Sequence, residues 1–103
     1  MRPVIFHPFA RRDFDDIADF ISDDNPDRAL AFVEGLEAAC RRRAQFPASG
    51  KRCDHIAAGL LRFPHKNYVI YYRVQTSGTV EILHVLHGAR DHEAVMRDDI
   101  PNQ

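Results

Sequence analysis

The sequence is poor in the residues on which disulfide-stabilised, membrane-spanning and nucleotide-binding proteins depend. It has only two cysteines, Cys40 and Cys53, and no apolar run approaches the ~20 residues that a bilayer-spanning helix needs. Its five glycines are scattered singly, so a glycine-rich phosphate loop is excluded, and no Gly-x-Ser-x-Gly motif marks a nucleophilic serine. We therefore expect two reduced, structural thiols, no cofactor and no membrane partner.

The apolar segment at the N-terminus is too short for a secretion signal. Residues 1–6 form a brief apolar burst that meets His7 and Pro8, whereas the apolar core of a signal peptide needs about 7–15 residues. We expect the protein to be cytoplasmic.

Length and composition predict one globular domain. Apolar residues make up 45% of the chain and charged residues 28%, an ordinary balance for a soluble fold. A chain of 103 residues has room for one hydrophobic core. Since repeats, low-complexity runs and linkers are absent from the sequence, we predict a single domain over residues 1–103.

Charge is distributed in three blocks although the net charge is only −1. Residues 1–39 and 76–103 are acidic, whereas residues 40–75 hold eight Lys and Arg against Asp54 alone. Two interpretations stand: solvated faces of alternating sign, or a basic surface directed at an acidic partner. Without an overall positive charge, strong independent binding to nucleic acid is not expected.

The first half of the sequence predicts a strand followed by a helical hairpin. Val4–Phe6 is β-prone, and Pro8 suits the first position of a helix because its missing N–H is not needed there. An amphipathic helix of about four turns follows. Asn25 and Pro26 then cap and begin a second helix, which ends after Arg41–Arg43. We interpret the acids of the first helix as a solvated face: Asp13, Asp15, Asp16 and Asp19.

The second half changes to strand periodicity. Residues 59–64, 68–74 and 79–86 read as three strands joined by turns, and Asp91 can cap a short terminal helix. The predicted fold is therefore α+β: an N-terminal strand, an antiparallel helical hairpin packed on an antiparallel β-meander, and a short C-terminal helix.

The six histidines do not form a recognisable metal site. His84 and His87 are the tempting pair, but residues three apart on a strand point to opposite faces. The other four lack Cys or carboxylate partners at ligand spacing. We expect no bound metal.

A metal-independent nuclease site deserves consideration because several cations follow adjacent strands. Cleavage of RNA needs a base, a cation for the phosphorane and an acid. The candidates are Arg62, Arg73, His84, His87 and Arg90. Alternation along the strands places them on differing faces, so a contact surface explains them equally well.

At this point the sequence resembles the toxins of the RelE/ParE superfamily, specifically the ParE branch. The resemblance covers essentially the whole chain. It is carried by residues 68–73, by the strand that follows and above all by residues 85–91, Val-Leu-His-Gly-Ala-Arg-Asp. Residues 46–52, 59–64 and 25–29 also fit the pattern.

This resemblance implies a toxin of a type II toxin–antitoxin module that poisons DNA gyrase by stabilising its cleaved-DNA complex. The RelE branch instead cleaves mRNA on the ribosome with several Lys and Arg and often a Tyr or His near the C-terminus. Here the tail from Arg97 to Gln103 has no Tyr. We therefore expect no catalytic residues, keep ribosome-dependent endoribonuclease as the alternative, and note a non-toxic partner-binding remnant as a third reading.

Four residues are our candidates for contact with the target: Arg62, Arg73, His87 and Arg90. His87 and Arg90 match the ParE motif. A structural reading is also open, in which Asp91 caps the last helix and Arg90 is its ion-pair neighbour.

A small ParD-like antitoxin is the partner that the resemblance implies, in a hetero-oligomer. Phe9, Phe20 and Phe32 lie off the main apolar stripes of their helices and either form a groove for the antitoxin or pack within the hairpin. A basic surface would attract an acidic antitoxin tail and raise its association rate. The six candidate contacts are Phe9, Phe20, Phe32, Arg41, Arg42 and Arg52.

Overall fold

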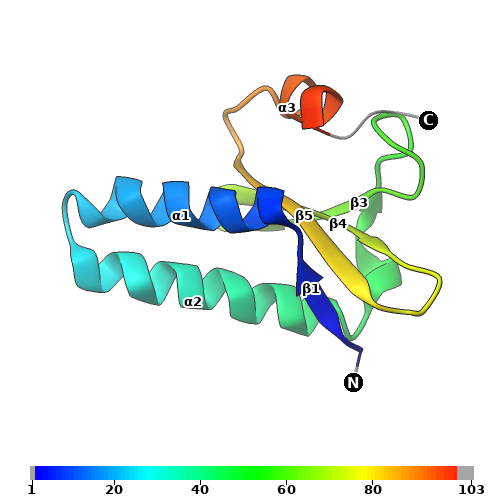
Figure 1. The fold of residues 1–103 in the computed structure, drawn as a ribbon, viewed down its shortest axis with the longest axis horizontal. Coiled ribbons are helices and arrows are strands. Elements are labelled where there is room, and N and C mark those ends of the chain that lie inside the picture. The colour runs from blue at the N-terminus through cyan, green and yellow to red at the C-terminus, as the bar shows by residue number, and fades with distance from the viewer. Residues whose placement is uncertain (1, 100–103) are drawn as a thin grey trace.

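The computed structural model describes residues 2–99, which form a helical hairpin, a five-stranded sheet and a terminal helix (Figure 1). The elements are β1 (Val4–Phe6), α1 (Pro8–Ser22), α2 (Pro26–Arg43), a 3₁₀ turn (Pro47–Ser49), β2 (Lys51–Arg52), β3 (Leu61–His65), β4 (Tyr68–Val74), β5 (Val80–His87) and α3 (His92–Asp99). The predicted fold class is confirmed. Within residues 2–99, no helix combines the length and the apolar content needed to cross a bilayer.

The strands lie in the order β1-β5-β4-β3-β2. The predicted antiparallel meander is formed by β3, β4 and β5. Two features go beyond the prediction. β1 pairs with β5 in parallel, which makes the sheet mixed, and β2 adds two residues to the outer edge of β3. A strand of two residues is too short to produce a readable alternation in the sequence.

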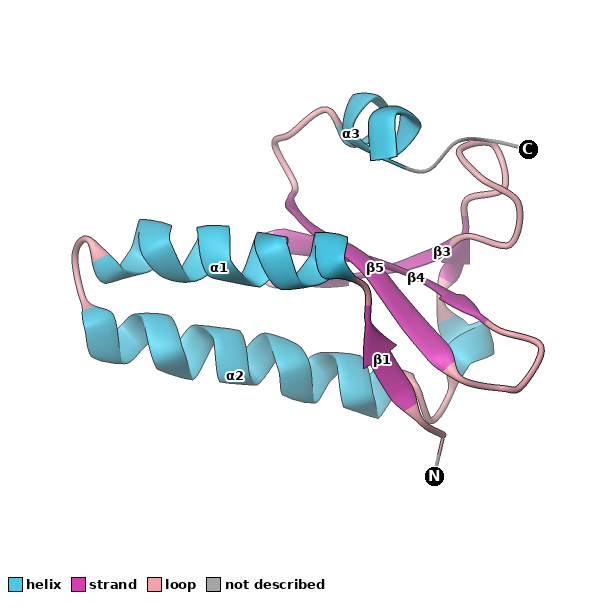
Figure 2. Cartoon of the chain, in the orientation of Figure 1, coloured by secondary structure: helices cyan, strands magenta, loops and turns pink. Residues whose placement is uncertain are grey.

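Both helices of the hairpin begin where the sequence predicts. Pro8 and Pro26 occupy the first turns of α1 and α2. The Asn25 side chain accepts a hydrogen bond from the Arg28 amide at 3.1 Å, the expected N-cap. At α1 the cap is the His7 ring, whose Nδ1 accepts from the Phe9 amide at 3.1 Å. The two helices then run side by side, and α3 is set apart from them (Figure 2).

The sheet is buried on both faces. The helix-side core, between the hairpin and the sheet, includes Phe14, Leu36, Ile70, Tyr72 and Val85. The α3-side core lies on the other face, beneath α3 and the segment 53–60, and consists of Cys53, Ala57, Leu60, Tyr71, Leu83, Leu86 and Met96. Leu83 has no partner on β4, because the register shifts between Tyr71 and Tyr72. β5 is apolar on both faces because each face is covered by one of the two cores.

Asp13 corrects the expectation that all acids of α1 face solvent. It is buried, and its Oδ2 accepts hydrogen bonds from His84 Nδ1 at 2.6 Å and from the Val85 amide at 2.9 Å. His84 Nε2 meets Asp99 Oδ2 of α3 at 2.9 Å, and the Phe9 ring stacks on the imidazole. A carboxylate on the apolar face is tolerated here because its charge has these partners. Asp13, His84 and Asp99 thereby connect α1, β5 and α3.

Candidate functional site

A cavity of about 550 Å³ lies at the end of α2, and a second of about 420 Å³ opens where β2 and β3 approach α3. The second cavity, here called the basic pocket, is lined by Lys51, Arg62, Pro64, Val69, Gly88 and His92. Strand register builds its cationic wall, since Lys51 pairs with Arg62 and Arg62 pairs with Tyr71. Residues that pair across strands point to the same face, so these three side chains form one row.

Tyr71 and His92 form a short hydrogen-bonded chain at the back of the basic pocket. Tyr71 Oη lies 2.8 Å from His92 Nδ1, and His92 Nε2 donates to the backbone carbonyl of His87 at 2.7 Å. Because that carbonyl only accepts, Nε2 carries a hydrogen, and in the neutral ring Nδ1 accepts from the phenol. Burial raises the pKa of Tyr71, while Arg62 offsets part of this effect. The pocket can bind an anion, and the Tyr71 phenol bonded to its His92 stays neutral.

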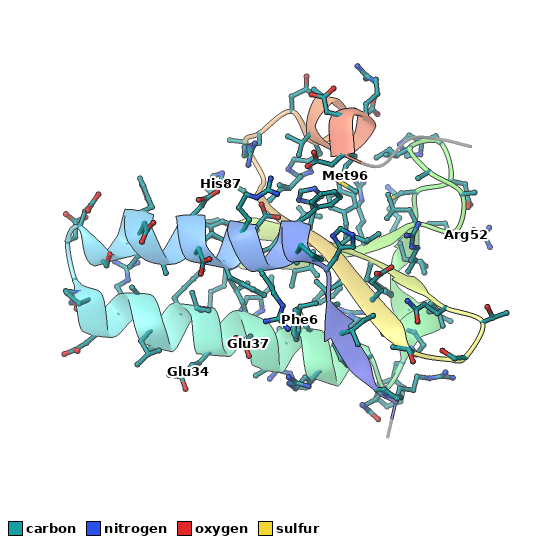
Figure 3. All side chains as sticks on the ribbon, viewed as in Figure 1. Phe6, Glu34, Glu37, Arg52, His87 and Met96 are labelled. Carbon is teal, nitrogen blue, oxygen red and sulfur yellow. The ribbon has the colours of Figure 1, made fainter. Side chains whose placement is uncertain are left out.

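The four candidate target contacts do not share one surface. Arg62 lines the basic pocket. Arg73 is ion-paired with Glu81, with Nε 3.1 Å from Oε1. His87 and Arg90 lie on the helix side of the sheet instead, where Figure 3 shows His87 beside α1. Their contact with a target stays a prediction.

The turn before α3 is confirmed in part. Asp91 caps the helix, its Oδ1 accepting from the Ala94 amide at 3.2 Å. Within residues 2–99, Arg90 forms no ion pair with Asp91. Arg90 is exposed and so available to a partner.

His87 and Arg90 belong to a smaller hollow of about 130 Å³, here called the corner pocket. Its residues are Asp13, Asp16, Ile17, Phe20, Tyr68, Val85, His87 and Arg90. Phe20 is 76% exposed, which is unusual for so large an apolar side chain. Phe32 packs against one of these residues, Tyr68, with the two ring centroids 5.5 Å apart. The corner pocket therefore combines an exposed aromatic side chain with a cation and a histidine.

The six candidate antitoxin contacts are also dispersed. Phe9 stacks on His84 of β5 and Phe32 packs against Tyr68 of β4, so both contact the sheet and not each other within the hairpin. Of the three aromatic candidates, only Phe20 projects outward. Arg41 lies over the Phe6 ring at 5.6 Å, and Arg42 lines the cavity at the end of α2. Arg52 pairs with Asp54 at 2.8 Å, both exposed, well apart from His87 in Figure 3. The basic middle of the sequence thus covers more than one face.

His84 and His87 diverge, as strand alternation predicts. His84 is buried between two carboxylates, and His87 is exposed. Among residues 2–99, no group of three or more His, Cys, Asp or Glu is placed to hold a metal ion. Cys40 and Cys53 are both buried, in different cores, and unbonded.

Sequence reasoning selected Arg62 but missed Lys51, Tyr71 and His92. The available signal was the alternation along β3 and β4, which assigns Arg62 and Tyr71 to a face of their own strands. The register between the strands, which brings these two side chains together, was not readable from the sequence. His92 comes from a separate element, α3.

Comparison with protein families matches residues 4–92 to the family described as "ParE toxin of type II toxin-antitoxin system, parDE". Toxin ParE1 of Mycobacterium tuberculosis is 32% identical over 65 residues, which span 63% of this chain and 66% of that protein, just under two thirds of its length. The putative toxin Y4kP of Sinorhizobium fredii is 33% identical over 87 residues, 84% of this chain and 88% of that protein.

Two solved structures share the fold. One is described as the chromosomal ParDE TA system from P. aeruginosa, with a TM-score of 0.71 and 19% identity over 84% of this chain and 96% of that chain. The other is the toxin–antitoxin complex RelBE2 from Mycobacterium tuberculosis, with a TM-score of 0.52 and 28% identity over the same shares.

Proposed function

Because the chain belongs to the ParE toxin family of type II toxin–antitoxin systems, we propose that it inhibits DNA gyrase by stabilising the cleaved-DNA complex. The family match over residues 4–92 carries this proposal. In the proposal the toxin acts by occupancy and breaks no bond itself. Gyrase is a cytoplasmic enzyme, so the proposal also places the toxin in the cytoplasm.

The basic pocket supports a binding role and not a catalytic one. Tyr71 is fully buried and its hydroxyl is bonded to His92. Both ring nitrogens of His92 are in turn occupied, by Tyr71 and by the His87 carbonyl. A general base needs a free site within reach of the proton that it removes. Lys51 and Arg62 remain as cations that suit a phosphate.

We propose that a ParD-like antitoxin neutralises the toxin through the corner pocket, with Phe20 as the anchor. Both solved relatives are described as toxin–antitoxin assemblies. Exposed aromatic side chains next to charged groups are the usual anchors of protein interfaces. Phe20, His87 and Arg90 provide this combination.

A supercoiling assay tests the gyrase proposal. Purified toxin should block supercoiling by gyrase and accumulate cleaved DNA. Arg62→Ala should weaken the inhibition, whereas Arg28→Ala, an exposed arginine at the start of α2, is the matched control and should not. Full supercoiling at saturating toxin would refute the proposal.

Ribosome-dependent cleavage of mRNA is the second candidate, favoured by one observation. The basic pocket brings Lys51, Arg62 and His92 around a cavity of about 420 Å³, with the Tyr71 hydroxyl behind them. New transcript ends in cells that express the toxin, lost in Arg62→Ala and His92→Ala but kept in Arg28→Ala, would establish this activity in place of the first.

A further inference from the structure

The cavity at the end of α2, here called the arginine pocket, shares Pro64 with the basic pocket and no lining residue with the corner pocket. It has a volume of about 550 Å³. Its lining residues are Ala39, Arg42, Arg43, Gln45, Phe46, Ser49, Phe63, Pro64 and His65. The floor is therefore apolar and the rim cationic.

Its framework is held in place by specific contacts. The Arg43 guanidinium lies 4.5 Å from the centroid of Phe63 and donates to Ser49 Oγ at 2.7 Å. Ser49 Oγ donates in turn to the Phe46 carbonyl at 2.6 Å. Tyr72 Oη donates to the Pro47 carbonyl at 2.5 Å, and a Cβ at Gly50 would collide with that hydroxyl. The loop around the cavity is therefore preformed, which lowers the entropic cost of binding.

Phe46 is the unexplained side chain of this loop. It is 72% exposed although it lies beside two arginines and above an apolar floor. A large aromatic side chain left in water at the rim of a hollow is typical of a site that a partner covers.

The electrostatics around the arginine pocket favour an anionic occupant. No Asp or Glu is among its lining residues, and Arg42 makes no ion pair with any of residues 2–99. Desolvation, Lys66 and Arg42 together lower the pKa of His65, as expected beside uncompensated positive charge.

Resting on the proposed function, we propose that the arginine pocket is the docking site for an acidic segment of the antitoxin that carries one aromatic or aliphatic side chain. Its carboxylates pair with Arg42 and Arg43, and its apolar side chain rests on Phe46 and Phe63.

The limited extent of the cationic surface favours a short peptide over a nucleic acid. Glu34 is exposed on the same helix, about two turns before Arg42 (Figure 3). A phosphate backbone that continued along α2 would meet this carboxylate, whereas a peptide of a few residues ends before it.

Fluorescence anisotropy with a synthetic peptide tests the proposal. The probe is fluorescein-labelled Glu-Asp-Glu-Phe-Glu-Asp-Glu, and the comparison peptide has Gln and Asn in place of Glu and Asp. The toxin should bind the acidic peptide about tenfold more tightly than the amide peptide at about 150 mM salt. Arg42→Glu and Phe46→Ala should each weaken binding at least about fivefold, and Arg28→Glu should not.

The proposal would be overturned if the Arg42→Glu and Phe46→Ala variants bound the acidic peptide as tightly as the wild type does. It would also be overturned if the wild type bound both peptides equally. Tighter, Arg42-dependent binding of a single-stranded oligonucleotide of about ten nucleotides would overturn it as well. Supercoiling assays on the same proteins separate this proposal from the proposed function, because Arg42→Glu should still inhibit gyrase. Peptide binding without gyrase inhibition by the wild type would sink the gyrase proposal and leave the acidic-segment site supported.

Discussion

At the scale of single residues, the most consequential group is His84, which lies between Asp13 and Asp99. Each ring nitrogen lies within hydrogen-bonding distance of a carboxylate oxygen, at 2.6 and 2.9 Å, so the two acids hold the ring from both sides. The side chain of His84 is only 3% exposed, so removal of one partner leaves buried polar atoms without compensation.

We predict that Asp13→Ala lowers the free energy of unfolding by about 3 kcal/mol. The substitution removes two buried hydrogen bonds and leaves the His84 imidazole without one of its carboxylate partners. Asp19→Ala, an exposed acid on the same helix, should change it by less than about 0.5 kcal/mol. Urea denaturation of the two variants measures both values. Equal stability of the variants would show that Asp13 is a surface acid after all.

Cys40 gives a pH-dependent prediction. Burial raises the pKa of its thiol from 9.0 to about 12. The unfolded thiol ionises above pH 9 while the folded one stays protonated, so its contribution to stability is present below pH 9 and is lost as the pH rises toward 12. Between about pH 8 and pH 10, unfolding free energy should fall about 1 kcal/mol further in the wild type than in Cys40→Ala. Parallel pH profiles would contradict this assignment.

At the scale of elements, α3 is fastened by few contacts. Met96 and Val95 pack in the α3-side core, and Glu93 lies 3.7 Å from His55. His92 bonds to Tyr71, and Asp99 bonds to His84. A short helix held by so few contacts can open without global unfolding, since local opening needs only these contacts to break. Because α3 also supplies His92, its opening would dismantle the wall of the basic pocket.

We predict that Asp99→Asn speeds amide hydrogen exchange in residues 92–99 by about tenfold, the effect of losing one charge-assisted hydrogen bond. Amides of β5 should keep their protection. The neighbouring exposed acid supplies the control, since Asp98→Asn removes the same charge without a bond to His84. Unchanged exchange in the Asp99 variant would mean that the bond to His84 does not limit the opening of the helix.

At the scale of the whole molecule, the basic pocket and the corner pocket lie on different faces of a small body with a radius of gyration of 13.4 Å. The basic pocket faces the α3 side of the sheet, and the corner pocket lies between the sheet and α1. Such separation allows one face to meet the target and another to meet the antitoxin.

We predict opposite phenotypes for substitutions on these two faces. Arg62→Ala should raise the toxin concentration for half-maximal gyrase inhibition at least about fivefold without weakening antitoxin binding, because it removes a cation from the basic pocket. Phe20→Ala should inhibit gyrase normally but bind the cognate antitoxin about tenfold more weakly. Supercoiling titrations with and without antitoxin measure both. If either variant lost both functions while folded, one shared surface would be the better description.

The sequence by itself determined the elements, their order and their caps, because these depend on residues close together in the chain. Pro8, Asn25 and Asp91 begin helices through contacts within three residues, and the period of 68–74 specifies a strand regardless of its neighbours. It also identified Arg62 and the ParE resemblance, since both are properties of local motifs.

Only the tertiary structure decided which of these residues meet. The bond from Asp13 to His84 joins positions 71 residues apart, and the row of Lys51, Arg62 and Tyr71 follows from strand register. The pairing of β1 with β5 likewise needs the whole hairpin in between. Helical periodicity assigned Asp13 to a polar face because it counts neighbours along one helix, whereas burial depends on what the rest of the chain brings to that face.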